Sequence, residues 1–433
     1  MKKYLKNKSY KKFLVYLSSG SLAKVVPFLI LTLTTTVLTT EDFGRISNFS
    51  LIVELSTSLI LVRMLPFFET DYYKNNNEQN NHIISNVVFI MIIAFIALLL
   101  LALLFANYLQ KITGLNLIWI ILGVFSGLFG AFASLRTSIL RLTDQARKFA
   151  TFQLLNVFLL AILTLFLVFI FKFHWIGRIL SIVITSIVLF SITLRFLYKN
   201  HDFPNKFNSN KIKEILIFSL PLIPFAISPF LKQGLDKIYI TNLISMSANG
   251  VYSLALSFSS IFDMIVASLF AVYTPMVYKN LSKSENLVNS KRNLVKQAYK
   301  LMGSLIAIEI AGFFAIMFFV KLFLSVDYLD SLIYLPYLLF HVLLRSMYLL
   351  LSTYILYSKK TKEFGLSALV FALMHTTFSY FLISKIGILG ALYALLFTDV
   401  IRLIYTYYLS NKHNPMPWWD ARSIFTGNSA IKN

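Results

Sequence analysis

The sequence predicts an all-α integral membrane protein with about twelve transmembrane helices. Of its 433 residues, 58% are hydrophobic and only 13% are charged, whereas an average soluble protein has about 25% charged residues. The mean hydropathy is +0.73. A chain that crosses a bilayer many times has this balance, because lipid rather than water surrounds most of its surface.

Apolar runs of the length needed to cross the hydrocarbon core, about 20 residues as a helix, recur along the whole chain. We predict spans at residues 13–38, 44–68, 83–106, 115–142, 147–171, 176–198, 214–243, 248–278, 298–322, 331–357, 363–384 and 387–409. The first run follows six lysines. It is longer than a signal-peptide core and lacks a small-residue cleavage site, so we interpret it as a retained helix.

The lysines and arginines of the loops predict the orientation of these spans. With the amino terminus in the cytoplasm, the cytoplasmic segments hold 28 of these residues and the outside loops hold 6. Cytoplasmic loops carry the excess of basic residues in membrane proteins. Both termini are therefore expected in the cytoplasm.

The charge and the composition exclude several classes of function. The net charge of +22 does not indicate nucleic acid, because the basic residues recur in short clusters between apolar runs and no groove-reading motif accompanies them. The chain has no cysteine, which excludes disulfides and thiolate metal sites. No glycine-rich phosphate loop is present, and we expect no cofactor.

The two halves of the sequence resemble each other. Residues 38–47, 135–138 and 177–180 match residues 243–253, 344–347 and 387–390, at offsets of 206, 209 and 210 residues. In the first match a polar turn is followed by a glycine and then by a predicted helix start. These matches predict a parallel repeat of six helices around a central cavity, with lobes at residues 1–205 (helices 1–6) and 206–433 (helices 7–12 and a short cytoplasmic tail).

Ionisable residues lie within the predicted spans, where each costs at least ~2.5–3.5 kcal/mol unless it faces a cavity or a partner. Lys24 and Arg345 have no acid within one turn, so they are the first candidates to bind an anion. Arg63 can instead extend to the inner interface. Two same-helix pairs can neutralise each other at their spacing: Lys232 with Asp236, and Asp399 with Arg402. The remaining ionisable residues at membrane depth are Glu54, Lys237, Asp263, Glu309, His341 and His375.

The predicted seventh helix has an unusual density of helix-breaking residues. They are Pro221, Pro224, Pro229 and Gly234. Proline removes a backbone hydrogen bond and kinks a helix, which a membrane tolerates where the backbone lines a cavity or packs on neighbours. We predict a bent helix that acts as a hinge or gate, with a static kink as the alternative.

Several short motifs resemble those of polysaccharide repeat-unit flippases, the Wzx-like family of the MOP superfamily. They are Glu41-Asp42-Phe43-Gly44-Arg45, Ser219-Leu220-Pro221-Leu222, Asp236-Lys237-Ile238-Tyr239-Ile240, Gly250-Val251-Tyr252-Ser253 and Gly387-Ile388-Leu389-Gly390-Ala391. The resemblance extends over the whole chain in length and number of spans. It carries little information about which sugar is transported.

The resemblance implies a transporter of the bacterial inner membrane. Its substrate would be an undecaprenyl-diphosphate-linked oligosaccharide for O-antigen or capsule, moved to the outer leaflet by alternating access. The diphosphate would meet basic residues in the cavity, because arginine forms bidentate phosphate contacts and lysine acts as a point charge. These residues are Lys24, Arg345, Arg63, Lys232 and Lys237. A polysaccharide polymerase and a chain-length regulator are further expected partners, beside membrane lipids.

The resemblance also implies transport without ATP, driven by a gradient of Na⁺ or H⁺. The carboxylates expected to bind the coupling ion are Asp236, Asp263, Glu309 and Asp399. Related flippases place a cation site in the second lobe, where Asp236 and Asp399 would lie. No metal site beyond this ion is expected.

Two other functions fit the sequence less well. A multidrug exporter of the same superfamily would favour an acidic, aromatic cavity, and the basic residues at membrane depth argue against it. A membrane enzyme that polymerises or acylates glycans would need a long outside loop or a catalytic histidine. No outside loop exceeds about ten residues, and the intramembrane histidines are better interpreted as lining a cavity.

Overall fold

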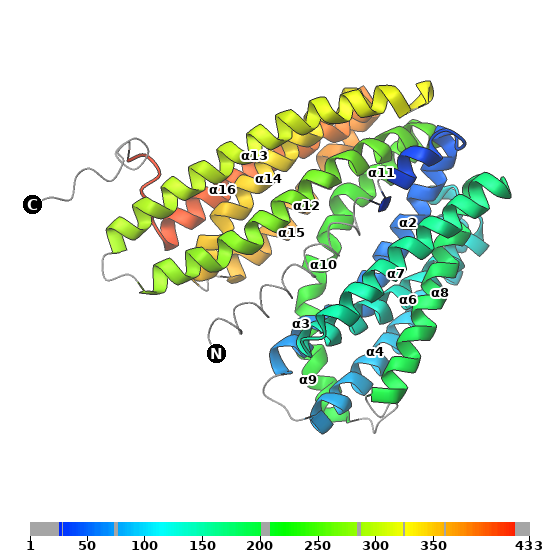
Figure 1. Cartoon of the computed structure of the whole chain (residues 1–433), viewed down its shortest axis with the longest axis horizontal. Helices are drawn as coiled ribbons and strands as arrows, with labels where there is room; N and C mark the ends of the chain where they lie inside the picture. Colours follow the sequence, from blue (N-terminus) through cyan, green and yellow to red (C-terminus); the bar gives the residue numbers. More distant parts are fainter. Residues whose placement is uncertain are drawn as a thin grey trace, which may run out of the picture. The chain divides into compact units, whose positions relative to one another are not determined.

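The computed structural model is built from helices, with no β-strand among the residues that it describes (Figure 1). These are residues 26–27, 29–72, 77–200, 208–283, 287–323, 325–358 and 361–420. The predicted all-α fold class is confirmed.

The helices pack as two compact units, each described here by itself. The first unit runs to Ser253 and also includes Phe323–Tyr328, whereas the second comprises Leu254–Leu322 and the residues from Leu329 onward. The boundary therefore lies within one long helix, and the lobes expected at residues 1–205 and 206–433 stay a prediction.

The first unit combines long helices with several short ones. They are α2 (Thr40–Leu61), α3 (Met64–Asp71), α4 (Asn77–Leu104), α5 (Ala106–Thr113), α6 (Leu117–Leu142), α7 (Ala146–Thr164) with a π-helical extension (Leu165–Ile170), α8 (His174–Asn200), α9 (Ser209–Ser219), α10 (Ile223–Pro229) and α11 (Leu235–Leu243). Helix α6 packs against α2, α4, α7 and α8 (Figure 1).

The second unit is made of long helices. They are α12 (Met246–Lys283), whose first residues belong to the first unit, α13 (Leu287–Phe323), α14 (Ser331–Tyr357), α15 (Thr361–Ile386) and α16 (Ile388–His413). A short 3₁₀ helix, Val326–Tyr328, precedes α14. Helix α16 packs against both α14 and α15.

Ten of the described helices are long and apolar enough to cross a membrane, and the bent pair of α2 and α3 brings the number to eleven. These eleven correspond in order to the predicted spans from 44–68 to 387–409. The predicted first span, 13–38, lies for the most part outside the described residues. The chain is therefore a multi-pass membrane protein.

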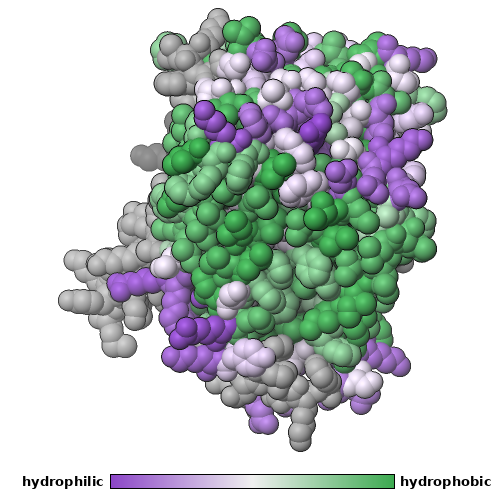
Figure 2. All heavy atoms as spheres, turned by 90° about the vertical axis from the view of Figure 1, so that its right-hand side faces the viewer, coloured by the Kyte–Doolittle hydropathy of each residue, from purple (hydrophilic) through white to green (hydrophobic). Residues whose placement is uncertain are grey.

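Large apolar side chains face outward on the spanning helices. In α4, Ile93, Leu100 and Leu104 are exposed by 51%, 61% and 75%. Figure 2 shows a broad band of apolar residues on one face, between polar residues gathered toward its two ends. Soluble monomers rarely expose such an area, whereas the hydrocarbon core of a bilayer covers it.

The span at 209–243 is not one α-helix. A 3₁₀ turn, Leu220–Leu222, separates α9 from α10, and a π-helical turn, Phe230–Gly234, separates α10 from α11. Pro221 lies in the first interruption, and Pro229 directly precedes the second. Each proline favours an interruption because it cannot donate the backbone hydrogen bond that an α-helix requires. The hinge role of these prolines and Gly234 stays a prediction.

The starts of α2 and α12 meet backbone to backbone, and we call residues 40–48 and 246–253 the α2–α12 seam. A β-carbon built on Gly250 would lie 1.8 Å from the carbonyl oxygen of Thr40, and one built on Gly44 would lie 2.1 Å from that of Met246. The sequence pattern predicted that each glycine precedes its helix start. Each instead lies four residues inside the helix, because Thr39 caps α2 with its hydroxyl and the helix begins at Thr40.

The seam is reciprocal at the sequence offset of 206 residues. Thr40 approaches Gly250, and Gly44 approaches Met246, where Met246 and Gly250 are the residues 206 positions after Thr40 and Gly44. Ser47 shares a hydrogen bond of 2.7 Å with Ser253, the residue 206 positions after it. In a contact with two-fold symmetry, each pairwise contact occurs twice, once from each of the two equivalent segments. The two helix starts are thus related by a local two-fold axis that passes between these serines.

We predict that Gly44→Ala and Gly250→Ala each lower the midpoint of thermal unfolding in detergent, because the added methyl group overlaps backbone that no side-chain rotation can move. Gly303→Ala in α13 is the matched control, since a β-carbon there meets nothing within 4 Å. Alanine is the better helix former by ~1 kcal/mol, so this control should be neutral or stabilising. Equal midpoints for all three variants would contradict the close approach of the seam.

Candidate functional site

A cavity of about 230 Å³ lies between α2 and the interrupted span, and we call it the charged cavity. It is lined by Leu51, Glu54, Leu55, Ser58, Ala226, Pro229, Phe230, Gln233, Gly234 and Lys237. Glu54 from α2 and Lys237 from α11 attract each other electrostatically. Opposite charges from two helices thus face one cavity at membrane depth, where an unpartnered charge would be costly.

The interruption of the span lets the two helices approach at this cavity. A β-carbon at Gly234 would lie 2.8 Å from a methyl group of Leu51 and 2.7 Å from the ring of Phe230. Only glycine fits there without displacing these side chains. The π-helical turn that ends at Gly234 is followed directly by α11, which carries Asp236 and Lys237.

Arg63 lies at the break between α2 and α3, where the chain bends by 46°. Val62 and Arg63 have φ angles of 45° and 54°, a left-handed conformation that costs a non-glycine residue ~1–2 kcal/mol. The break has a local cause, because Pro66 has no N–H and its ring would clash with the carbonyl of residue 62 in a continuous helix. Backbone strain of this kind gathers at functional sites.

Asp236 is fully buried and accepts a hydrogen bond of 3.2 Å from the hydroxyl of Tyr252. Its predicted same-helix partner, Lys232, lies half-buried in the π-helical turn. Within the seam, the Asn249 side chain donates to the Asn48 oxygen at 2.8 Å, and Asn48 donates to the carbonyl of Thr113 at 2.8 Å. Polar groups of the seam therefore bond one another.

In the second unit, Arg345 of α14 donates to Asp263 of α12 at 2.5 Å. The two side chains are 46% and 27% exposed, so this ion pair is accessible from outside the unit. Glu309 of α13 is buried, and one of its carboxylate oxygens has no hydrogen-bond partner among the described residues. Its charge is close enough to interact with that of Asp263.

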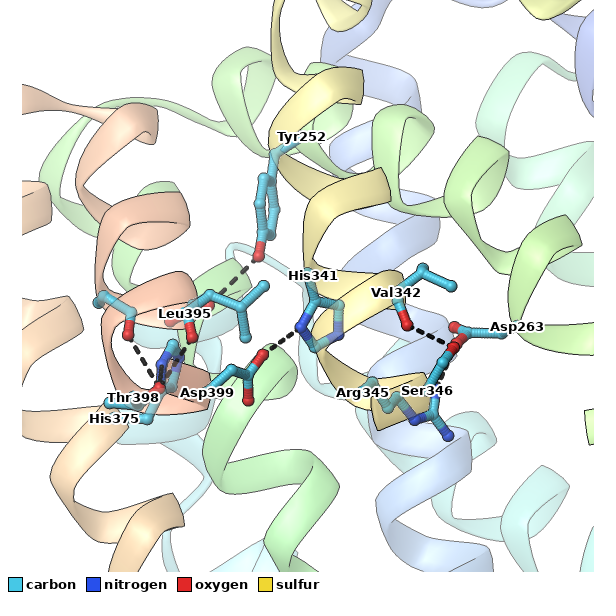
Figure 3. Close-up of polar contacts among 12 residues, drawn as sticks. Tyr252, Asp263, His341, Val342, Arg345, Ser346, His375, Leu395, Thr398 and Asp399 are labelled. Carbon is cyan, nitrogen blue, oxygen red and sulfur yellow. Dashed lines mark hydrogen bonds and ion pairs between the residues drawn. The ribbon is translucent and has the colours of Figure 1, made fainter. Parts of the chain in front are cut away.

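A second polar pair lies on α14 and α16, as Figure 3 shows. The Nδ1 atom of His341 is hydrogen-bonded to a carboxylate oxygen of Asp399, and both side chains are buried. Next to Asp399 in sequence, the hydroxyl of Thr398 lies 3.5 Å from His375 of α15. The guanidinium of Arg402 lies 3.5 Å from the centre of the Tyr348 ring.

The structure corrects two expectations about charge pairing and leaves a third untested. Arg345 is not an unpaired cation, because Asp263 reaches it from a helix 82 residues away in sequence. Asp399 meets His341 instead of depending on Arg402 alone. Lys24 lies outside the described residues. The roles assigned to these residues in binding a diphosphate or an ion stay predictions.

The pairs of His341 with Asp399 and of Lys237 with Glu54 were not foreseen. The sequence did single out each of the four residues as ionisable at membrane depth. Spacing along the chain, however, indicates only partners on the same helix. No group of three or more histidines, aspartates or glutamates able to hold a metal ion occurs in the part of the chain that the structure describes.

The fold and these sites define a polytopic membrane protein with charged pairs held between its spanning helices. A family model for "Polysaccharide biosynthesis protein" matches residues 9–281, more than half of the chain. The chain belongs to this family. A protein of Haemophilus influenzae described as "Uncharacterized membrane protein" is 23% identical over 287 residues, which cover 65% of this chain and 67% of that protein.

Solved structures show the same fold. A multidrug resistance MATE family transporter of the MOP superfamily, in an inward-facing conformation, matches 92% of this chain and 97% of its own with a TM-score of 0.65 and 14% identity. The lipid II flippase MurJ, in an inward closed conformation, matches 92% of this chain and 87% of its own with a TM-score of 0.66 and 17% identity. The chain therefore has the fold of MOP-superfamily transporters.

We predict that Arg345 and Asp263 are energetically coupled. Arg345→Ala and Asp263→Ala should each lower the unfolding midpoint in detergent, because each leaves an opposite charge without its partner. The double variant should recover part of the loss, with an interaction free energy toward the lower end of ~0.5–3 kcal/mol because the pair is partly exposed. Strictly additive effects in this double-mutant cycle would show that the ion pair contributes nothing.

Proposed function

We propose that this chain is a flippase that moves an undecaprenyl-diphosphate-linked oligosaccharide from the cytoplasmic to the outer leaflet of a bacterial inner membrane. Membership of the polysaccharide biosynthesis protein family supports a role in making surface polysaccharide. The fold shared with MATE transporters and with a protein named a lipid II flippase supports transport, including transport of a lipid-linked sugar.

The observation that carries the proposal is that basic residues at membrane depth lie opposite carboxylates from other helices. Arg345 meets Asp263, and Lys237 shares the charged cavity with Glu54. Such a pair keeps the cation neutralised while the protein is empty. A diphosphate carries the same sign of charge as the carboxylate that it would displace, so the cation can exchange one anion for the other without becoming unpartnered in lipid.

The two cations suit different parts of this task. The guanidinium of Arg345 is planar and can hold two phosphate oxygens at once. The ammonium of Lys237 acts as a point charge within the charged cavity. Lys24, Arg63 and Lys232 are further candidates to meet the diphosphate as it moves. Alternating access follows in this proposal from rocking one lobe against the other.

An ion gradient would supply the energy, since the sequence has no phosphate loop for ATP. Asp263, which accepts a hydrogen bond from Arg345, is one carboxylate that could bind Na⁺ or H⁺ in alternation with the substrate. Glu309, buried with an oxygen that lacks a partner among the described residues, is a further candidate to bind the ion. Asp399, paired with His341, and Asp236, bonded to Tyr252, are the other candidates.

A multidrug exporter is the second candidate, because a MATE transporter matches almost its whole length to this chain. In that case the acidic residues would bind a cationic drug, and the basic residues would only neutralise them. The family match favours the flippase over this alternative. The fold and the family also favour a transporter over a membrane enzyme that modifies glycans.

Complementation tests the proposal in the cell. In a strain that lacks the gene for this chain, the unaltered chain should restore surface glycan, and so should Lys279→Ala, which removes an exposed lysine of α12. Arg345→Ala, Lys237→Ala and Lys24→Ala should restore at least about tenfold less, because one charge-assisted phosphate contact contributes ~1.5–3 kcal/mol. The amount of each variant in the membrane must be measured in parallel.

Export of cationic dyes by the unaltered chain, without any restoration of surface glycan, would favour the multidrug exporter and remove the diphosphate assignments. Full restoration by all three variants would keep the flippase but would move the anion site elsewhere.

A further inference from the structure

A second cavity, of about 320 Å³, lies inside the bundle of α2, α6, α7 and α8 in the first unit, and we call it the hydroxyl-lined cavity. Its walls are Val53, Thr57, Ser126, Phe129, Gly130, Ala133, Ser134, Thr137, Phe152, Gln153, Asn156, Leu160, Ile182, Thr185, Ser186 and Leu189. None of these lining residues is charged. Half of them carry a hydroxyl or an amide, which is unusual for the interior of a helix bundle in a membrane.

Two of the hydroxyls are buried without a partner. Ser126 of α6 and Thr185 of α8 are 1% and 3% exposed. Neither hydroxyl oxygen has a hydrogen-bond partner in the part of the chain that the structure describes. Leaving such a group unsatisfied costs ~1–3 kcal/mol, so a polar group that reaches either hydroxyl would be stabilised there.

The amides of Gln153 and Asn156 add hydrogen-bonding capacity on the α7 wall. They lie three residues apart, which places them on one face of the helix, and both side chains line the cavity. Each amide offers two donor hydrogens and an acceptor oxygen. Together with the two hydroxyls, the cavity presents donors and acceptors in several directions but no formal charge.

The charged cavity and the hydroxyl-lined cavity lie on two different faces of α2. Glu54 and Ser58 line the first, whereas Val53 and Thr57 line the second. A substrate with an anionic diphosphate and an uncharged polar part could therefore meet separate environments along one helix.

We propose that the hydroxyl-lined cavity binds an uncharged sugar ring of the lipid-linked oligosaccharide, a step that rests on the flippase function proposed above. A sugar offers hydroxyls that can donate to and accept from Ser126, Thr185, Gln153 and Asn156. Its apolar ring face can pack on Phe129 or Phe152, which also line the cavity. The volume lies near the lower end of the ~300–1,000 Å³ found for small-molecule sites, so the cavity holds part of an oligosaccharide rather than the whole.

The lining also argues against other occupants. A cationic drug would need a carboxylate, and a diphosphate would need a basic group, but the lining contains neither. A purely apolar occupant, such as a lipid tail, would leave Ser126 and Thr185 unsatisfied.

Binding to the purified chain in detergent tests this proposal. The probes are the lipid-linked oligosaccharide pool extracted from the strain that carries the chain, and undecaprenyl diphosphate without sugar. The test variant combines Gln153→Met and Asn156→Leu, which keep the side-chain size and remove the amides. Thr151→Val is the matched control, because Thr151 is an exposed residue of the same helix whose hydroxyl bonds only the carbonyl of Arg147.

We expect the double variant to bind the oligosaccharide-bearing lipid at least about tenfold more weakly, since it loses two or more hydrogen bonds of ~1 kcal/mol each. Its affinity for undecaprenyl diphosphate should be unchanged, and the control should match the unaltered chain for both lipids. Unchanged affinity for the sugar-bearing lipid would overturn the sugar site while the flippase function stands. Failure of the unaltered chain to bind either lipid would overturn the flippase function and this proposal with it.

A labelling experiment covers the case in which the double variant does not fold. The chain has no cysteine, so Asn156→Cys creates a single reactive thiol at the cavity wall, at a half-buried position. A water-soluble maleimide should label it, and the sugar-bearing lipid should slow labelling at least about tenfold more than undecaprenyl diphosphate does. Thr151→Cys, at an exposed position of the same helix, should show no such difference. Equal protection of the Asn156→Cys thiol by both lipids would overturn the assignment.

Discussion

In lipid, no water is available to satisfy the polar groups that this chain carries among its spanning helices. A charge at membrane depth is therefore costly unless it meets a partner inside the chain or faces a cavity. In both units that partner comes from another helix: Lys237 faces Glu54 across the charged cavity, and Arg345 meets Asp263. Each of these contacts thus joins residues of two different helices within one unit. In the flippase proposed here, these would be the places where a diphosphate displaces a carboxylate from a cation.

The backbone of the first unit is irregular where it lies beside these charges. Where it lines the charged cavity, the span at 209–243 includes a π-helical turn in place of α-helix. Helix α2 ends at a break in which Val62 and Arg63 have positive φ angles. At the other end of α2, the α2–α12 seam brings two helix starts into backbone contact through Gly44 and Gly250. The reciprocal contacts of the seam, at one sequence offset, are what a duplicated six-helix unit would leave behind. Irregular helices thus border the cavity, whereas the closest backbone contact lies between the matching starts of α2 and α12.

Much of the fold could be predicted from the sequence, because lipid imposes one length and one polarity on every span. The predicted span from 248 to 278 corresponds to α12, and the prolines of the predicted seventh helix mark where its α-helix is interrupted.

The site was less predictable. Arg345 looked unpaired because its acid lies on another helix, and the hydroxyl-lined cavity gave no signal, since Ser126 and Thr185 are residue types that often face neighbouring helices in membranes. Pairing between helices depends on packing, which spacing along one helix does not encode.

The most direct measurement is translocation by the purified chain in liposomes. Lipid-linked oligosaccharide extracted from the strain that carries the chain would be placed in the bilayer, and an impermeant reagent outside would oxidise only the sugar of the outer leaflet. The account predicts that the chain makes nearly all of the oligosaccharide accessible, while liposomes without protein, or with a fluorescent phospholipid in place of the oligosaccharide, stay half-protected. If the oligosaccharide also remains half-protected in the presence of correctly folded chain, the claim that this protein flips a diphosphate-linked glycan is wrong.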